Sequence, residues 1–301
     1  TNRTTDDRSF QRMTISKKVI NAQVMESNSH VFRCPICSSG MAMADKSQLV
    51  CLDNHSFDLS KNGYVNLAPQ AHVTKYDKML FEARKTVMSS GFFNPVLEYI
   101  TAIASEHLEG REKAFILDAG CGEGTHLSAI LSQLPGDTIG VGIDLAKEGI
   151  TAASKEYPGS IWSVADLASC PFQANQFDVI LNILSPANYA EFTRLLKSDG
   201  LFVKAVPESG YLKELRAIFY EEGERKDDSD PVVRFKEHFD SVTTKRLTYL
   251  FPLAPGLLAP LIRMTPLTWG AGNEKIEEAL GTAIENITID FTVITGVKRV
   301  D

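Results

Sequence analysis

The chain has 301 residues, 44% of them hydrophobic and 23% charged, which is the balance of a globular protein with one large core and room for a smaller module. Its net charge is −7, whereas proteins that bind nucleic acid through their overall charge are strongly basic, so any such contact must be confined to a local surface. Residues 1–110 hold 12 Lys and Arg against 11 Asp and Glu, and the remaining residues hold 19 against 27.

Membrane and export classes are disfavoured by the same composition. No apolar run approaches the roughly 20 residues that span a bilayer, and the first thirty residues lack the apolar centre of a signal peptide. Five cysteines in such a chain indicate a reducing compartment, where metal binding is favoured over disulfides. We therefore expect a cytoplasmic protein with no membrane partner.

Residues 1–28 are polar without clear periodicity, so we expect a flexible tail. Residues 29–70 contain the spacing C-x2-C-x13-C-x3-H, formed by Cys34, Cys37, Cys51 and His55. Three thiolates and one imidazole complete the tetrahedral shell of a structural zinc and leave no position open for catalysis. The alternative is two unrelated buried thiols and a surface histidine. We expect a zinc-binding module over 29–70 that melts on chelation before the rest of the chain.

Residues 71–110 are predicted to be a linker and helices. Basic side chains, among them Lys75, Arg84 and Lys85, follow one another between residues 72 and 90, and an amphipathic helix is expected over 95–108. The basic side chains favour either a local surface for RNA or an ordinary solvated helix face, and charge alone does not choose between the two.

Residues 111–301 begin with an apolar strand that runs into L-D-A-G-C-G-E-G, residues 117–124. Its glycines follow G-x-G-x-G with Asp118 in front, whereas dinucleotide sites use G-x-G-x-x-G. This variant is typical of S-adenosylmethionine (SAM) methyltransferases. Gly120, Gly122 and Gly124 would allow the backbone to approach the cofactor closely, because they carry no Cβ.

Two more acidic residues end predicted strands. Asp144 follows the run 138–143 and is placed to accept the ribose hydroxyls of the cofactor, and Asp166 follows 161–165 and would accept the adenine amine. Further strands are expected at 177–184 and 200–206, and late, partly antiparallel ones at 248–251, 287–293 and 297–300. The predicted fold is α/β: a class I, Rossmann-like SAM methyltransferase with a mostly parallel seven-stranded sheet and a small N-terminal zinc module.

The loop after the fourth strand is the expected place for the acceptor. Asn182 could orient a base edge and Pro186 could form a flat wall, although Asn182 at a strand end could equally cap the next helix. A flipped base would gain from an aromatic partner, for which Tyr211 and Trp269 are candidates, but aromatic residues at such spacing are more often core. No general base can be named from these residues.

Several segments together are similar to one family. C-P-I-C, C-L-D-N-H-S-F-D-L-S-K-N-G-Y-V-N-L, F-E-A-R-K, the glycine loop and M-T-P-L-T-W occur in this order, from about residue 32 to residue 291. They resemble the bacterial 23S rRNA (guanine-N1)-methyltransferases of the RlmA type, and residues 75–93 and Tyr211 favour the Gram-positive branch.

The resemblance implies methyl transfer from SAM to N1 of a guanine in a hairpin loop of 23S rRNA domain II. It also implies a zinc module that helps to recognise RNA, a homodimer, and a link with resistance to tylosin-type macrolides. The candidates for RNA contact are Tyr64, Lys75, Arg84, Lys85, Tyr211 and Trp269.

Two other functions stay open at this stage. A methyltransferase for a small molecule would share residues 114–207 but would not need the zinc module, and a noncatalytic adaptor would keep the fold and lose SAM affinity. If the zinc module is independent, losing zinc should weaken RNA binding more than SAM binding.

Overall fold

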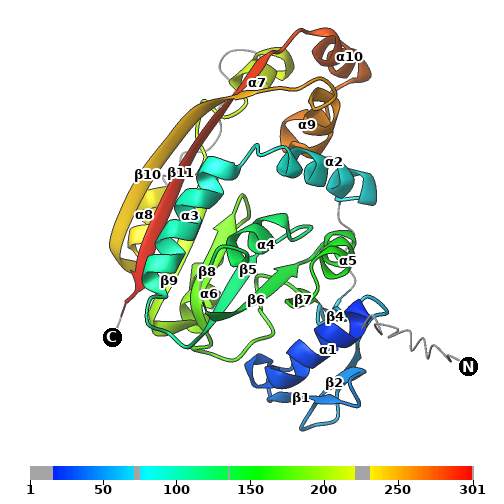
Figure 1. Cartoon of the computed structure of the whole chain (residues 1–301), viewed down its shortest axis with the longest axis vertical. Helices are drawn as coiled ribbons and strands as arrows, with labels where there is room; N and C mark the ends of the chain where they lie inside the picture. The colour runs from blue at the N-terminus through cyan, green and yellow to red at the C-terminus, as the bar shows by residue number, and fades with distance from the viewer. Residues whose placement is uncertain (1–15, 71–74, 135, 221–230, 300–301) are drawn as a thin grey trace, which may run out of the picture.

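The computed structural model describes residues 16–70, 75–134, 136–220 and 231–299. Its centre is an eight-stranded sheet in the order β10-β11-β9-β8-β5-β6-β7-β4 (Figure 1). The strands are β4 (Val65–Asn66), β5 (Lys113–Ala119), β6 (Asp137–Asp144), β7 (Ile161–Val164), β8 (Phe177–Ile183), β9 (Leu196–Pro207), β10 (Phe239–Pro252) and β11 (Asn286–Lys298).

Seven of these strands form the class I methyltransferase sheet that the sequence predicts. Neighbours from β9 to β7 pair in parallel, and β11 inserts antiparallel between β9 and β10. The eighth strand, β4, comes from the N-terminal module and pairs in parallel with β7. The late strands also differ from expectation, since 287–293 and 297–298 lie in one strand, β11, and β10 already begins at Phe239; residue 300 of the last predicted strand lies outside the described residues.

One face of the sheet is covered by three helices: α3 (Asn94–His107), α4 (Thr125–Leu131) and α5 (Lys147–Glu156). Their side chains Ile100, Leu127 and Ile150 pack with Ile116 of β5 and Trp162 of β7, all fully buried. The predicted amphipathic helix over 95–108 is therefore confirmed as α3. No helix in the described ranges is long and apolar enough to cross a membrane.

The opposite face is shared between helices and the N-terminal module. The elements here are α1 (Lys17–Ser27), η1 (Ser29–Val31), the small antiparallel sheet of β1 (Met41–Ala44), β2 (Gln48–Cys51) and β3 (Ser56–Asp58), α6 (Tyr189–Leu195) and α8 (Pro231–Lys236). Met25 of α1 and Phe32 of the module belong to the same buried cluster as Leu117 and Ile143 of the central strands. Because a parallel sheet needs cover on both faces, the module completes the core of the large domain.

The expectation of a flexible tail over 1–28 is wrong for its second half, and residues 1–15 lie outside the described residues. Residues 17–27 form α1, whose Ser16 side chain accepts a hydrogen bond from the Val19 amide at the helix start. The buried Asn21 side chain donates to the Ser154 carbonyl (3.3 Å) and accepts from the Gly159 amide (3.0 Å). A helix attached by a buried amide lacks the apolar stripe by which the sequence would identify it.

The remaining helices lie toward the carboxyl ends of the parallel strands (Figure 1). They are α2 (Lys78–Ser89), α7 (Lys213–Phe219), α9 (Leu258–Met264), η2 (Pro266–Thr268) and α10 (Asn273–Gly281). Arg84 and Lys85 of the predicted linker thus lie in α2, which is capped by Asp77, whose carboxylate accepts from the Leu80 amide at 2.7 Å. Helix α2 packs against α9 and also reaches α5, so it covers the edge where open α/β sheets bind ligands.

Candidate functional site

The four predicted metal ligands converge in the N-terminal module. The ligand atoms of Cys34, Cys37, Cys51 and His55 all lie within 4.8 Å of one another. The Cys37 and Cys51 sulfurs are 3.6 Å apart, and His55 Nδ1 lies 3.3 Å from Cys51 Sγ and 3.7 Å from Cys34 Sγ. A tetrahedral zinc with Zn–S bonds of about 2.3 Å separates two sulfurs by about 3.8 Å, so the cluster fits this ion.

Local backbone geometry builds this cluster. Ser38 and Asn54 have positive φ angles of 66° and 61°, and their amides bond back to the Cys34 and Cys51 carbonyls at 2.9 and 3.0 Å. Each turn therefore brings a pair of ligands together. With three thiolates and one imidazole, the cluster offers a structural site with no open coordination position.

A cavity of about 450 Å³ lies at the carboxyl ends of the parallel strands, a volume typical of small-molecule sites. Four of the predicted cofactor residues line it, namely Gly120, Gly122, Asp144 and Asp166, and we call it the donor cavity. Pro186, which the sequence suggested as a wall for the acceptor, lines this cavity instead and does not line the cavity beside it. Residues that the sequence did not single out complete its walls, including Tyr76 and Phe81 from the segment that contains α2.

Asp144 holds the glycine loop as well as facing the cavity. Its two carboxylate oxygens accept hydrogen bonds from the Gly122 amide (2.9 Å) and the Ala146 amide (2.8 Å). Burial raises the pKa of Asp144, and these two backbone bonds oppose the rise. A carboxylate oxygen has further lone pairs, so contact with ribose hydroxyls stays compatible with both bonds.

Asp118 and Gly124 do not line the donor cavity. Gly124 has φ +81°, and a Cβ there would lie 2.6 Å from the Trp162 ring, so this glycine serves the packing of the loop on the sheet. Gly120 differs, because it lines the cavity and a Cβ there would lie 2.0 Å from Ser185 Oγ. Asp118 is buried beneath the loop with its Oδ2 unpartnered among the described residues.

The charges around the loop fit a cationic ligand. Two buried carboxylates, those of Asp118 and Glu123, and the half-buried carboxylate of Asp144 surround one guanidinium, that of Arg84. Arg84 Nε lies 2.8 Å from Glu123 Oε2, while Glu123 Oε1 has no hydrogen-bond partner in the described part of the chain. Burial raises the pKa of Asp118 to about 7, and the carboxylates of Asp144 and Glu123 add to the rise. SAM carries positive charge on its sulfonium and ammonium groups, so the surplus of acid here favours it.

Asn182 cannot contact an acceptor as the sequence suggested, because it is fully buried and its side chain is engaged. Its Nδ2 donates to the carbonyls of Ala119 and Pro186, each at 3.0 Å, and its Oδ1 accepts from Lys204 Nζ at 2.6 Å. Burial lowers the pKa of Lys204 to about 8. This network ties the loop after β8 to β5 and β9, so Asn182 shapes the cavity wall and touches no substrate.

A neighbouring cavity of about 360 Å³ adjoins the donor cavity and shares Tyr76, Arg84, Leu184 and Ser185 with it. Leu184 has a positive φ of 56°, an uncommon conformation for this residue and one that recurs at functional sites. Most of the remaining wall is apolar or aromatic, including Met88, Phe93, Tyr211, Met264 and Leu267.

One further cation lines the neighbouring cavity. Arg216 of α7 donates from Nε to the Tyr211 carbonyl at 3.0 Å, and the Tyr211 ring packs 4.7 Å from that of Phe291. Sequence patterns could not single out Arg216, because it lies in an ordinary helix far along the chain from the glycine loop.

The six candidates for RNA contact divide into three groups. Tyr64 is buried in the core and presents no surface to RNA, whereas Arg84 is paired with Glu123 and lines both the donor cavity and the neighbouring cavity. Tyr211 is also buried, yet it lines the neighbouring cavity. Lys75, Lys85 and Trp269 remain exposed or half-buried and accessible.

The exposed candidates lie in two places. Lys85 is paired with Glu156 at 3.0 Å. Lys75 and Trp269 line a third, open cavity of about 560 Å³ with Arg263, and the Trp269 ring meets the Tyr76 ring edge-on at 5.2 Å. Trp269 of this third cavity therefore contacts Tyr76, which lines the donor cavity.

Comparison with known proteins agrees with both halves of the molecule. The family model described as "RlmA, N-terminal" matches residues 32–74, and a model described as "Methyltransferase domain" matches residues 116–200. Demethylmenaquinone methyltransferase of Chlorobaculum tepidum is similar over a shorter stretch, with 28% identity over 39% of this chain and 52% of the relative.

Two relatives match over nearly their whole length. YxjB of Bacillus subtilis (strain 168), whose name places it among the 23S rRNA (guanine-N1)-methyltransferases, is 42% identical over 89% of this chain and 97% of its own. The 23S rRNA (guanine(748)-N(1))-methyltransferase of Streptomyces fradiae is 26% identical over 87% of this chain and 95% of its own. With the zinc-ligand cluster and the donor cavity in place, the chain belongs to the family of SAM-dependent 23S rRNA (guanine-N1)-methyltransferases of the RlmA type.

Proposed function

We propose that this protein transfers a methyl group from SAM to N1 of a guanine in a hairpin loop of 23S rRNA domain II. The observation that carries the proposal is the neighbouring cavity, which adjoins the donor cavity and is walled largely by apolar and aromatic side chains. A base that leaves its stack needs such a pocket, because stacking and exclusion of water replace the contacts it gives up. The two full-length relatives are named for methylation of 23S rRNA at guanine N1.

The donor cavity would hold SAM through its loop ends. We assign Asp144 to the ribose hydroxyls, Asp166 to the adenine edge, and the buried Asp118 and Glu123 to the positive charge of the methionine part. SAM supplies a methyl carbon already activated on sulfur, so the chain has to align donor and acceptor and exclude water. Leu184 and Ser185 line both cavities and would set the distance between the two reactants.

Guanine N1 carries a proton at neutral pH, and this proton must leave before or during methyl transfer. Among the described residues that line the neighbouring cavity there is no carboxylate and no histidine. We propose that Arg216 contacts the guanine O6 and stabilises the negative charge that develops there as the N1 proton passes to water. The bond from Arg216 Nε to the Tyr211 carbonyl would orient the guanidinium for this contact.

Primer extension tests the proposed reaction. Unmodified 23S rRNA incubated with the protein and SAM should give a reverse-transcription stop in the domain II hairpin, because a methyl on N1 blocks base pairing. A methylated RNA that gives its stop in another domain would contradict the proposed site. No stop, together with SAM-dependent methylation of a quinone, would favour the small-molecule alternative, and no SAM binding at all would favour the adaptor.

The role of Arg216 can be measured in the same reaction. Arg216→Gln should lower the methylation rate at pH 7 by roughly a hundredfold, the loss typical of one electrostatic donor. The loss should shrink as the pH rises, because hydroxide then removes the N1 proton without help. Lys213→Gln, an exposed lysine in the first turn of the same helix, is the matched control. A loss that is equal at every pH would assign Arg216 to RNA binding instead.

Two finer expectations from the resemblance belong to this proposal. We propose that the protein acts as a homodimer in the cytoplasm, which size-exclusion chromatography with light scattering would test for the oligomer. We also propose that methylation contributes to resistance to tylosin-type macrolides. A strain lacking the protein should then show a lower inhibitory concentration of tylosin, and an unchanged value would contradict this.

A further inference from the structure

One loop of the donor cavity is attached to the zinc module. The loop runs from Asp166 to Gln173, and its first part lines the donor cavity with Asp166, Leu167 and Ala168. Its last part lies against the N-terminal module, where Phe172 and Phe32 form an isolated antiparallel bridge. We call residues 166–173 the strut loop.

The strut loop meets the module beside a metal ligand. The amide of Arg33, the residue before Cys34, donates to the Pro171 carbonyl at 2.9 Å, and the Gln173 amide donates to the Val31 carbonyl at 2.8 Å. The Gln173 side chain adds a bond to the Phe32 carbonyl at 3.2 Å. The backbone that carries a zinc ligand is thus directly bonded to the loop that lines the donor cavity.

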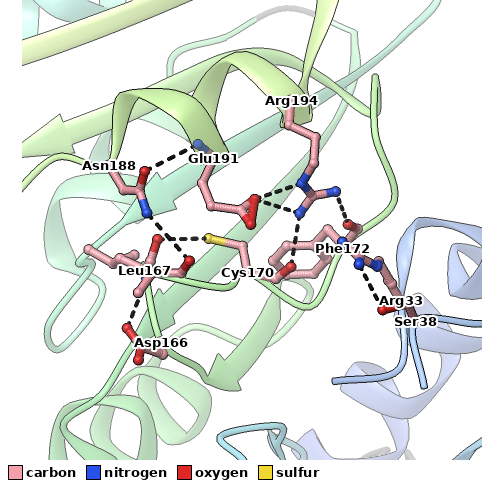
Figure 2. Close-up of polar contacts among 10 residues, drawn as sticks. Arg33, Ser38, Asp166, Leu167, Cys170, Phe172, Asn188, Glu191 and Arg194 are labelled. Carbon is pink, nitrogen blue, oxygen red and sulfur yellow. Dashed lines mark hydrogen bonds and ion pairs between the residues drawn. The ribbon is translucent and has the colours of Figure 1, made fainter. Parts of the chain in front are cut away.

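Arg194 of α6 holds the strut loop from the other side (Figure 2). Its Nη1 donates to the Phe172 carbonyl at 2.8 Å and its Nη2 to the Cys170 carbonyl at 3.1 Å. Glu191 fixes the guanidinium, since its Oε2 accepts from Arg194 Nε at 2.7 Å. An arginine that binds two carbonyls two residues apart through a planar fork fixes the path of the loop as well as its place.

The cavity end of the strut loop is fixed by two further hydrogen bonds. Asp166 accepts from the Ala168 amide at 2.8 Å, and Asn188 Nδ2 donates to the Ala168 carbonyl at 3.4 Å (Figure 2). On the other side of Asp166, β7 pairs with β4 of the N-terminal module through Ser163 and Val164. The module therefore bonds to the chain both before and after Asp166.

We infer that Arg194 is a positioning residue for the donor cavity, and that the strut loop makes zinc binding and SAM binding reinforce each other. The zinc ligands hold the module backbone at Arg33, this backbone and Arg194 hold the strut loop, and the strut loop presents Asp166 to the cofactor. Such coupling is reciprocal, so each ligand must raise the affinity for the other by the same factor. The inference depends on the donor cavity binding SAM and does not depend on which RNA is methylated.

The first test measures SAM affinity by calorimetry on the full chain. Removing zinc with a chelator should weaken SAM binding by about 5- to 150-fold, the usual range of coupling between sites. Arg194→Ala with zinc bound should also weaken SAM binding. Removing zinc from this variant should then weaken SAM binding by a smaller factor than in the wild type. Arg194→Lys should recover part of the affinity, because lysine can still donate to one carbonyl.

Arg299→Ala is the matched control, since it removes an arginine that is paired with Asp240 at 3.0 Å and whose other bonds go to the carbonyls of Lys236 and Glu237. It should leave both affinities unchanged. If zinc removal weakens SAM binding by the same factor in Arg194→Ala as in the wild type, Arg194 is not part of the coupling. If zinc removal leaves wild-type SAM affinity unchanged, the inference is wrong.

The second test needs no variant and no apo protein, so a failure to fold cannot disguise the result. Zinc transfer from the intact protein to a colorimetric chelator is followed with and without saturating SAM. The apparent zinc affinity should rise in SAM by the factor found in the first test. Equal zinc affinities would contradict the coupling even if the protein methylates rRNA normally, which separates this inference from the proposed function.

Discussion

The metal cluster and the donor cavity are built in opposite ways. All four zinc-ligand candidates fall between residues 34 and 55, and two tight turns bring them together. The donor cavity takes walls from residues 76 to 188, on a helix segment and four strand ends that are distant in the chain. A local site is visible in residue spacing, whereas an assembled site depends on packing. The structure joins the two through the strut loop, so the local site supports the assembled one.

The largest effect should follow loss of a zinc ligand. Cys37→Ser should lower the free energy of unfolding of the whole chain by several kcal/mol, since structural zinc sites contribute roughly 10–16 kcal/mol of binding free energy. Scanning calorimetry should show one transition at lower temperature, because the module covers one face of the central sheet. Ile36→Ser, in the same turn and 61% exposed, is the control. A separate early transition of the module would restore the independent domain expected from sequence.

Replacing a carboxylate of the donor cavity should mainly weaken the binding of the cofactor. Asp144→Asn loses the charge that accepts from the Gly122 and Ala146 amides, and an amide nitrogen must face one of these donors. SAM affinity should fall roughly ten- to hundredfold, in line with about 1.5–3 kcal/mol for a hydrogen bond to a charged group. Asp137→Asn, at the exposed start of the same strand, should leave it unchanged. Equal affinities for the two variants would refute the assignment of Asp144.

A change of pH should alter the charge beside the donor cavity, whereas the positions of the zinc ligands should not change. Because the pKa of Asp118 is raised to about 7, SAM affinity should increase up to about tenfold from pH 6 to pH 8, as the carboxylate that favours a cation forms. Without SAM, the contribution of Asp118 to the free energy of unfolding should decline as the pH rises from about 4 to 7, because only the unfolded chain releases this proton there. Calorimetric titrations of the wild type and Asp118→Asn test this, and an equal pH dependence in both would contradict it.

The smallest effect is expected at the surface between the two regions. Lys85→Ala breaks an ion pair with Glu156 in which both side chains are about half exposed, so stability should change by less than about 0.5 kcal/mol. We expect unchanged SAM affinity and an unchanged salt dependence of RNA binding, because Glu156 already neutralises this lysine. A salt slope lower by about one would instead identify a phosphate contact.

Residue patterns predicted most of what depends on neighbours in the chain. The zinc-ligand cluster, the class I sheet, the glycine loop and the positions of Asp144 and Asp166 at strand ends were all expected. Each follows from spacing, or from the rule that parallel strands end at one edge of a sheet. The family resemblance was confirmed by the comparisons.

The predictions that were wrong share one physical cause: the partners of a side chain in the folded protein cannot be read from its neighbours in the sequence. Arg84 and Lys85 follow each other in sequence, yet the helix turns one into the donor cavity and the other to solvent. Asn182 was assigned to the acceptor because its place in the loop suggested it. Only its three hydrogen bonds within the fold show that its side chain is not available to an acceptor. α1 was missed because a buried amide, Asn21, takes the place of an apolar stripe.

By itself, then, the sequence determined the chemistry that is available: three thiolates with an imidazole, and a glycine loop with carboxylates at strand ends. The tertiary structure decided which side chains are free to use that chemistry and which are already bonded. It also decided that the zinc module completes the core and reaches the donor cavity through the strut loop. Contacts such as Arg33 to Pro171 and Arg194 to Phe172 join segments far apart in the chain, and no local pattern encodes them.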